Sequence, residues 1–137
     1  MDSEQLLGLD VGLKRTGIAR ASLNARLAEP LVTISTQKVI ATIKNLIEEY
    51  NVSAVVVGLP RNLQGDDTQQ TNWVRDWVKQ TMRKIDLPFY WQDEVLTSRI
   101  AQAQKLSYKK AHDVDSLAAA IILQDFLDSA EVERCMV

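Results

Sequence analysis

The feature that most constrains this chain is the run AVVVG at residues 54–58, in which no polar side chain interrupts the sequence. A strand with one face in water alternates apolar and polar residues, whereas a continuous apolar run suits a strand that is covered on both faces. Strands of that kind belong to parallel sheets with helices packed on them. The run therefore predicts an α/β fold with a parallel strand at residues 54–58.

Three short strands are expected ahead of this run, at residues 6–10, 15–21 and 31–35. The first ends in an acid, and the charged pair Lys14 and Arg15 lies in the connection to the second. Connections this short favour an antiparallel meander, although short apolar runs alone do not separate strands from buried helices.

Beyond residue 35 the apolar residues recur at helical spacing, up to about residue 50 and again across residues 73–82. A polar loop is expected at 60–68, a strand at 89–92, helices at 98–106 and 113–127, a basic loop at 107–112 and a tail at 129–137. An antiparallel start followed by βαβ crossovers predicts a mixed sheet with helices against it. The whole chain, residues 1–137, is expected to form one domain.

Composition narrows the class of protein further. Apolar residues make up 46% and charged residues 25%, which is typical of a folded globular chain and excludes a disordered one. The net charge of −2 provides no global field for a polyanion, so any nucleic-acid binding needs a local basic patch. No apolar run approaches the roughly 20 residues that cross a bilayer. The single cysteine, Cys135, forms no intrachain disulfide and fits a cytoplasmic location.

Two acids, Asp10 and Glu94, follow the carboxyl ends of predicted strands, where ligands bind in open α/β sheets. A third, Asp115, lies in the first turn of the last helix, ahead of an apolar stripe that packs on the sheet. Three carboxylates in one place repel one another unless a cation is bound. Their hard oxygen ligands suit Mg²⁺ or Mn²⁺, which can activate water for phosphodiester cleavage.

Each acid also has a simpler interpretation. Asp10 can start the turn that contains Gly12, and Asp115 can favour the helix N-terminus electrostatically. Asp93 and Glu94 can be solvated loop residues. Only a shared location favours the catalytic interpretation. Because neighbouring residues alternate across a strand, one member of the pair faces the cleft, and we choose Glu94 with Asp93 in reserve.

Basic residues flank the expected cleft and would hold phosphates without reading bases. Each of them alone is more simply a solvated side chain. The candidates are Lys14, Arg15, Arg61, Lys105, Lys109 and Lys110.

Four ordered motifs resemble a known family: DVGLKRTGIA (10–19), VVVGLPRNLQG (55–65), DEVLTS (93–98) and VDSLAAAIILQDFLD (114–128). Together they resemble the YqgF family, also called RuvX, across residues 6–128. The resemblance implies a ribonuclease-H-like, cytoplasmic, metal-dependent nuclease that trims the 5′ end of 16S rRNA precursors in ribosome biogenesis. Its acids fall on Asp10, Glu94 and Asp115. The sequence departs from the family at Val11, usually aromatic, and at Val95, usually arginine.

Other functions compete with this one. A Holliday junction resolvase acting on branched DNA would use the same acids and would be a symmetric dimer, so monomer and homodimer both stay open. A nucleotide-binding module of the actin and sugar-kinase type needs a second domain that 137 residues do not supply. A non-catalytic RNA-binding scaffold would not need converging acids.

Overall fold

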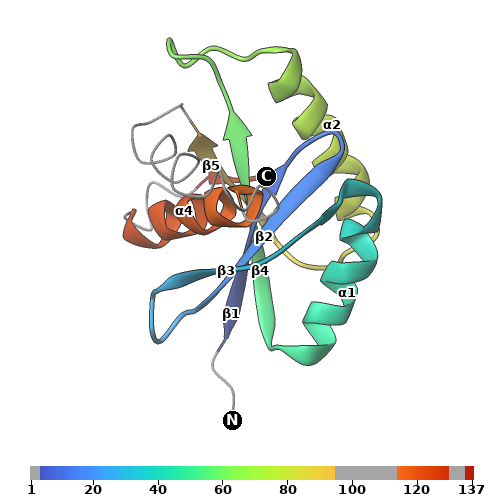
Figure 1. The fold of residues 1–137 in the computed structure, drawn as a ribbon, viewed down its shortest axis with the longest axis vertical. Coiled ribbons are helices and arrows are strands. Elements are labelled where there is room, and N and C mark those ends of the chain that lie inside the picture. Colours follow the sequence, from blue (N-terminus) through green and yellow to red (C-terminus); the bar gives the residue numbers. More distant parts are fainter. Residues whose placement is uncertain (1–3, 95–113, 130–134) are drawn as a thin grey trace.

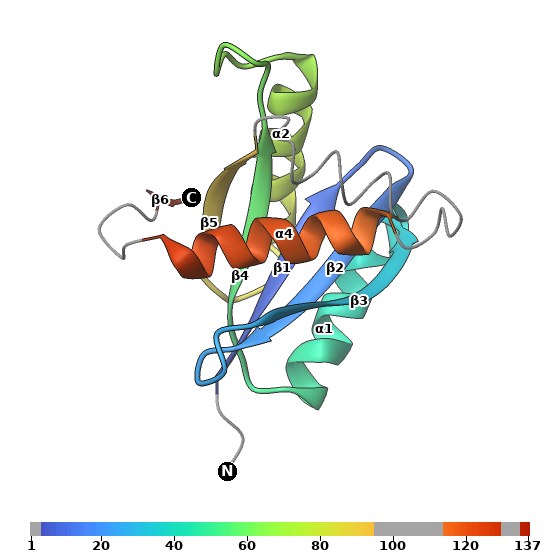
Figure 2. The same cartoon turned by 60° about the vertical axis from the view of Figure 1, so that its left-hand side comes forward.

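A computed structural model describes residues 4–94, 114–129 and 135–137. Its strands form one mixed sheet in the order β3-β2-β1-β4-β5-β6, with α4 across one face and α1 and α2 on the other (Figures 1 and 2). The elements are β1 (Gln5–Val11), β2 (Arg15–Ser22), β3 (Ala28–Ser35), the 3-10 helix η1 (Thr36–Lys38), α1 (Val39–Glu49), β4 (Val52–Pro60), α2 (Gln69–Met82), β5 (Phe89–Glu94), α4 (Val114–Asp128) and β6 (Cys135–Met136).

The sheet combines an antiparallel meander with parallel crossovers, as the sequence predicts. β2 pairs antiparallel with both β1 and β3, whereas β4 pairs parallel with β1 and with β5. The apolar run at residues 54–58 therefore lies in a parallel strand between two other parallel strands. Val55 and Val57 face the core under α1 and α2, and Ala54 and Val56 face the core under α4. The prediction of a doubly covered strand is confirmed.

The same alternation divides β1 between the two cores. Leu7, Leu9 and Val11 belong to the α1/α2 side, and Leu6 belongs to the α4 side. Because side chains two residues apart share a face, Asp10 lies on the α4 side with Leu6. The strand therefore delivers one polar group at the end of an otherwise buried face.

Helix α4 lies close to the sheet because residues on both sides of the contact are small. Ala118 and Ala119 are buried on the helix, in agreement with the apolar stripe predicted to pack on the sheet. On the sheet, a Cβ added to Gly8 would lie 2.7 Å from Leu123 Cβ. There is thus no room between this helix and β1 for a side chain at Gly8.

One segment differs from the sequence-based expectation, and two others fall outside the described structure. Within the expected tail, Cys135 and Met136 pair with Trp91 and Tyr90 as the edge strand β6, and a strand of two residues has no period to reveal it. The helix predicted at 98–106 and the basic loop at 107–112 lie outside the described residues. Among the described helices, none combines the length and apolarity needed to cross a membrane.

Candidate active site

Asp10 and Asp115 are brought together through one glycine. Asp10 pairs with Gly17 in the antiparallel ladder between β1 and β2. Gly17 in turn lies against the first turn of α4, where an added Cβ would be 1.9 Å from the backbone oxygen of Asp115. The start of α4 therefore rests on the ladder position opposite Asp10. A hydrogen bond of 3.2 Å from Ser116 N to Thr33 Oγ1 also fixes this end of the helix on β3.

Glu94 reaches the same face of the sheet from the end of β5. Its Oε2 atom lies 2.8 Å from the position that a Cβ on Gly58 would occupy. Gly58 is in β4, the strand between β1 and β5. The missing side chain at Gly58 therefore leaves space for the Glu94 carboxylate over β4, on the Asp10 side.

Asp93 points the other way, as alternation along a strand requires. Its side chain is 60% exposed and lies 3.6 Å from Arg61 Nη1 in an ion pair. Of the two neighbouring acids, the structure thus places Glu94, and not Asp93, on the side of Asp10.

The three carboxylates interact electrostatically, with Asp10 in the middle. Burial and, to a lesser extent, the negative charge of Asp115 together raise the pKa of Asp10 to about 7. Burial and, to a lesser extent, the charge of Asp10 together raise the pKa of Glu94 to about 8. Asp10 and Glu94 therefore lack a countercharge of their own among the described residues.

The Asp115 carboxylate is incompletely satisfied within the described part of the chain. Its Oδ2 atom is buried and accepts no hydrogen bond there. Arg15 Nε lies 3.5 Å away, in an ion pair with a guanidinium that is itself largely exposed. A buried oxygen without a hydrogen-bond donor is a plain candidate for a cation ligand.

The donor set fits a hard divalent cation in its chemistry. Carboxylate oxygens from β1, β5 and α4 are the ligands that Mg²⁺ and Mn²⁺ prefer. In residues 4–94, 114–129 and 135–137, however, no three Asp, Glu, His or Cys side chains already converge as a ready-made metal site. Binding one ion with all three acids would therefore require side-chain rotation toward it.

The predicted basic residues separate into three groups. Lys14 and Arg15 are exposed beside Asp115, and with Gly12 and Asp115 they line an open hollow of about 510 Å³. Arg61 lies with Asp93 on the α2 side of β5, away from Asp10. Lys105, Lys109 and Lys110 fall outside the described residues.

Sequence reasoning missed the residues that shape this site without carrying its charge. Gly17 and Gly58 make room for Asp115 and Glu94, and a glycine inside a strand is the only trace that such a close approach leaves in sequence. Thr36 was also missed. Its hydroxyl donates to the Gly12 carbonyl at 2.6 Å and lies 2.9 Å from Thr16 Oγ1, which fixes the turn that carries Lys14 and Arg15.

Comparison with known proteins agrees with this architecture. A family model described as "RuvX: Holliday junction resolvase" matches residues 4–129. A Rickettsia rickettsii protein named "Putative pre-16S rRNA nuclease" is 37% identical over 132 residues, covering 90% of this chain and 86% of the relative. A Roseiflexus protein of the same name is 38% identical over 139 residues, covering 94% of this chain and 99% of the relative.

Among solved structures, "T. thermophilus RuvC in complex with Holliday junction substrate" superimposes with a TM-score of 0.58 and 15% identity. The match covers 98% of this chain and 99% of the other. At this identity the likeness concerns the fold, and it confirms the ribonuclease-H-like architecture predicted from the sequence.

Proposed function

Because the chain belongs to the RuvX family, we propose that it is a nuclease that hydrolyses phosphodiester bonds at the 5′ end of precursor 16S rRNA. The observation that carries the proposal is that three acids from separate elements lie on one face of the sheet, near enough for their charges to interact. Besides burial, the charge of Asp10 raises the pKa of Glu94, and the charge of Asp115 raises the pKa of Asp10. A fold has no structural reason to keep such a cluster, whereas a metal-dependent nuclease needs one.

We assign Asp10, Glu94 and Asp115 as the acids that hold Mg²⁺ or Mn²⁺. A divalent ion, when bound, supplies an activated water and stabilises the leaving oxygen. The chain itself supplies the rest. Asp10 lies electrostatically between the other two acids, so it is the carboxylate best placed to share an ion with either. Lys14 and Arg15 provide exposed positive charge beside Asp115, where a phosphate of the substrate can be held.

We propose precursor rRNA as the substrate because of the sequence relatives, and not because of the fold. Relatives at 37–38% identity are named for precursor rRNA, whereas the likeness to a resolvase at 15% identity concerns architecture. A role in rRNA processing places the activity in the cytoplasm. Cleavage of a Holliday junction stays the alternative, since the family model is described by that activity and the same three acids would serve it.

The experiment compares two substrates under one set of conditions. Purified protein is incubated with end-labelled precursor 16S rRNA and with a labelled four-way DNA junction, each with Mn²⁺, with Mg²⁺ and with chelator. We expect metal-dependent cleavage of the RNA, absent in Asp10→Asn. Symmetric cutting of the junction together with intact RNA would replace this function by the alternative.

A further inference from the structure

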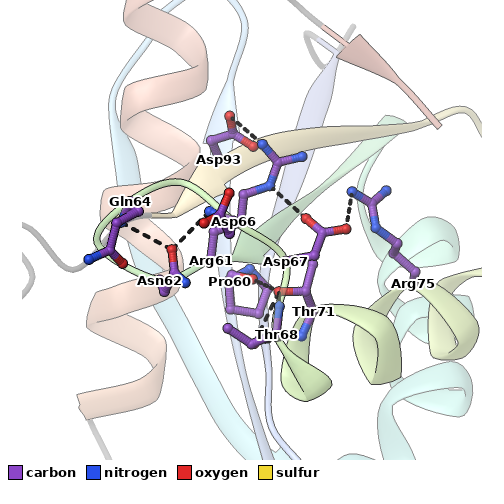
Figure 3. A network of polar contacts seen from close by, with 10 residues as sticks. All are labelled: Pro60, Arg61, Asn62, Gln64, Asp66, Asp67, Thr68, Thr71, Arg75 and Asp93. Carbon is purple, nitrogen blue, oxygen red and sulfur yellow. Dashed lines mark hydrogen bonds and ion pairs between the residues drawn. The ribbon is translucent and has the colours of Figure 1, made fainter.

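A chain of ion pairs joins Asp93, at the end of β5, to the loop after β4 and to α2 (Figure 3). Arg61 is at its centre and contacts two acids: its Nη1 atom lies 3.6 Å from Asp93 Oδ2, and its Nε atom lies 3.2 Å from Asp67 Oδ1. Arg75 Nη2 lies 3.3 Å from the other carboxylate oxygen of Asp67. The series thus runs from Asp93 through the loop after β4 to α2.

This series of contacts both begins and ends on β5. Asp93 is its first member, and the Arg75 guanidinium at the other end lies 5.7 Å from the centre of the Trp91 ring, within cation–π range. The main chain adds a direct link, because Arg61 N donates to the Glu94 carbonyl oxygen at 3.3 Å. Arg61 therefore contacts both of the last two residues of the strand that carries Glu94.

The loop from which Arg61 acts is itself well braced. Asn62 Oδ1 accepts hydrogen bonds from the backbone of Gln64 at 3.0 Å and of Asp66 at 2.8 Å. Thr68 and Thr71 form a capping box at the start of α2, and the Thr71 hydroxyl donates to the Pro60 carbonyl (Figure 3). Such internal hydrogen bonding gives Arg61 a fixed base from which to hold β5.

The charges in this series cancel, which argues against a phosphate contact at Arg61. Two guanidinium groups face two carboxylates, and the Arg61 side chain is only 28% exposed. A phosphate at Arg61 would meet two carboxylates that are already paired with it, whereas Lys14 is exposed and has no ion-pair partner among the described residues. Arg61 is better placed to orient the strand than to bind the substrate.

We propose that Arg61 is a positioning residue for the nuclease reaction, holding the end of β5 through Asp93 so that Glu94 presents its carboxylate on the Asp10 side. The proposal rests on the function proposed above. Alternation along β5 gives it a direct mechanism, since holding Asp93 on one face fixes Glu94 on the other. Supporting partners of this kind matter through geometry, and their own ion-pair energy is small.

The test compares Arg61→Gln, Asp93→Asn and the double variant with the parent protein on precursor 16S rRNA in Mn²⁺. Lys44→Gln is the matched control, because it removes one positive charge from an exposed position on α1. Asp93→Asn changes an exposed carboxylate to an amide of the same shape, so it is expected to fold normally. Each variant is measured for kcat, KM, Mn²⁺ affinity by calorimetry and single-stranded RNA affinity over a salt series.

We expect both single variants to lower kcat by about tenfold and to weaken Mn²⁺ binding, with KM and RNA affinity unchanged. The double variant should be no slower than either single variant, because both remove the same contact. Lys44→Gln should match the parent. The inference is overturned if Arg61→Gln raises KM and flattens the salt dependence at unchanged kcat, or if the two single effects multiply in the double variant.

Asp10→Asn in the same assay separates this inference from the proposed function. If Asp10→Asn is inactive while Arg61→Gln and Asp93→Asn keep the parental kcat, only the positioning role is wrong. If Asp10→Asn cleaves as well as the parent, the acidic site itself is wrong and the positioning role falls with it.

Discussion

Gly17 supports the backbone of Asp115 so closely that a Cβ on Gly17 would lie 1.9 Å from the Asp115 carbonyl oxygen. The same glycine is the ladder partner of Asp10. The separation between these two acids is therefore set by backbone packing, and not by the reach of flexible side chains. Two rigid elements, a strand pair and the start of a helix, hold the candidate site.

Gly17→Ala should destabilise the protein and displace the first turn of α4. The added methyl group meets backbone atoms, which cannot rotate away as a side chain can. Overpacking a core costs about 1–3 kcal/mol, and we expect the free energy of unfolding to fall by at least the upper part of that range. Urea unfolding followed by circular dichroism measures it.

Gly65→Ala is the contrasting control for this substitution. Gly65 has a φ of +81°, and in the described part of the chain no atom lies within 4 Å of an added Cβ, so only backbone strain is introduced, at a cost of about 1 kcal/mol. A Gly17→Ala variant as stable as Gly65→Ala would contradict the close approach of α4 to β2.

Gly58→Ala should lower kcat strongly while leaving the protein folded. Its added Cβ would lie 2.8 Å from Glu94 Oε2 and 2.6 Å from Ile122 Cδ1, and both are the ends of flexible side chains that can move aside. The fold should therefore persist while the Glu94 carboxylate is displaced. We expect kcat on precursor rRNA to fall by roughly 10- to 100-fold, as displacements of about 1 Å in active sites do.

Gly8→Ala serves as the matched control, since its Cβ would meet Leu123 and Ala119 on the same helix but none of the three acids. It should lower stability while leaving the activity of each folded molecule near that of the parent. Equal losses of kcat in Gly8→Ala and Gly58→Ala would indicate a general packing effect and would remove the assigned role of Gly58.

The sequence was sufficient to predict most of the architecture, because the fold depends on local periods. The doubly buried strand β4, the helices α1 and α2 and the meander all follow from apolar spacing and short connections. The position of Asp10 at a strand's carboxyl end is likewise a local property. Alternation was enough to expect one of Asp93 and Glu94 to face the cleft.

What could not be predicted depends on contacts between residues far apart in the chain. Nothing local distinguishes Gly17, which touches Asp115, from a glycine in an open turn such as Gly65. The sequence makes Arg61 a candidate for phosphate binding, because it is a positive residue in a loop that follows a strand. Its ion pairs with Asp67 and Asp93 appear only once β4, α2 and β5 are assembled.

Asp10→Asn should make stability less dependent on pH in metal-free buffer. Burial and the charge of Asp115 raise the pKa of Asp10 from 3.8 to about 7, so the folded protein binds a proton that the unfolded chain has lost. Stability of the parent should therefore fall as pH rises from about 4 through about 7, and Asn removes that contribution. Urea unfolding in chelator should show that the free energy of unfolding of Asp10→Asn, relative to that of the parent, is higher at pH 8.5 than at pH 4.

The control is a divalent cation, which should stabilise the parent more than Asp10→Asn. Mn²⁺ stabilises whichever form binds it, so the melting temperature of the parent should rise more than that of Asp10→Asn. A parent protein whose stability is the same at pH 4 and pH 8.5, or whose response to Mn²⁺ equals that of Asp10→Asn, would contradict the acid cluster.

Lys14→Gln should weaken RNA binding uniformly and reduce its salt dependence. Lys14 is exposed beside Asp115 and, within the part of the chain that the structure describes, takes part in none of the ion pairs. A lysine on a phosphate releases counterions, so its loss should lower the slope of log affinity against log salt by about 0.7 for a single strand. Arg15 is a poorer probe, because removing it also leaves Asp115 without its ion pair.

The salt series should use single-stranded RNA with the parent, Lys14→Gln, Lys44→Gln and a Lys109→Ala/Lys110→Ala double variant, all in chelator. Lys44→Gln changes the net charge equally but lies on α1, so its slope should equal that of the parent. Lys109 and Lys110 lie outside the described residues, and the sequence alone predicts that their loss flattens the slope further. Because phosphate contacts carry no base information, none of these variants should change preference between RNA sequences. If Lys14→Gln and Lys44→Gln had the same slope as the parent, the turn between β1 and β2 would not hold the substrate. Lys14 would then be only a solvated surface residue.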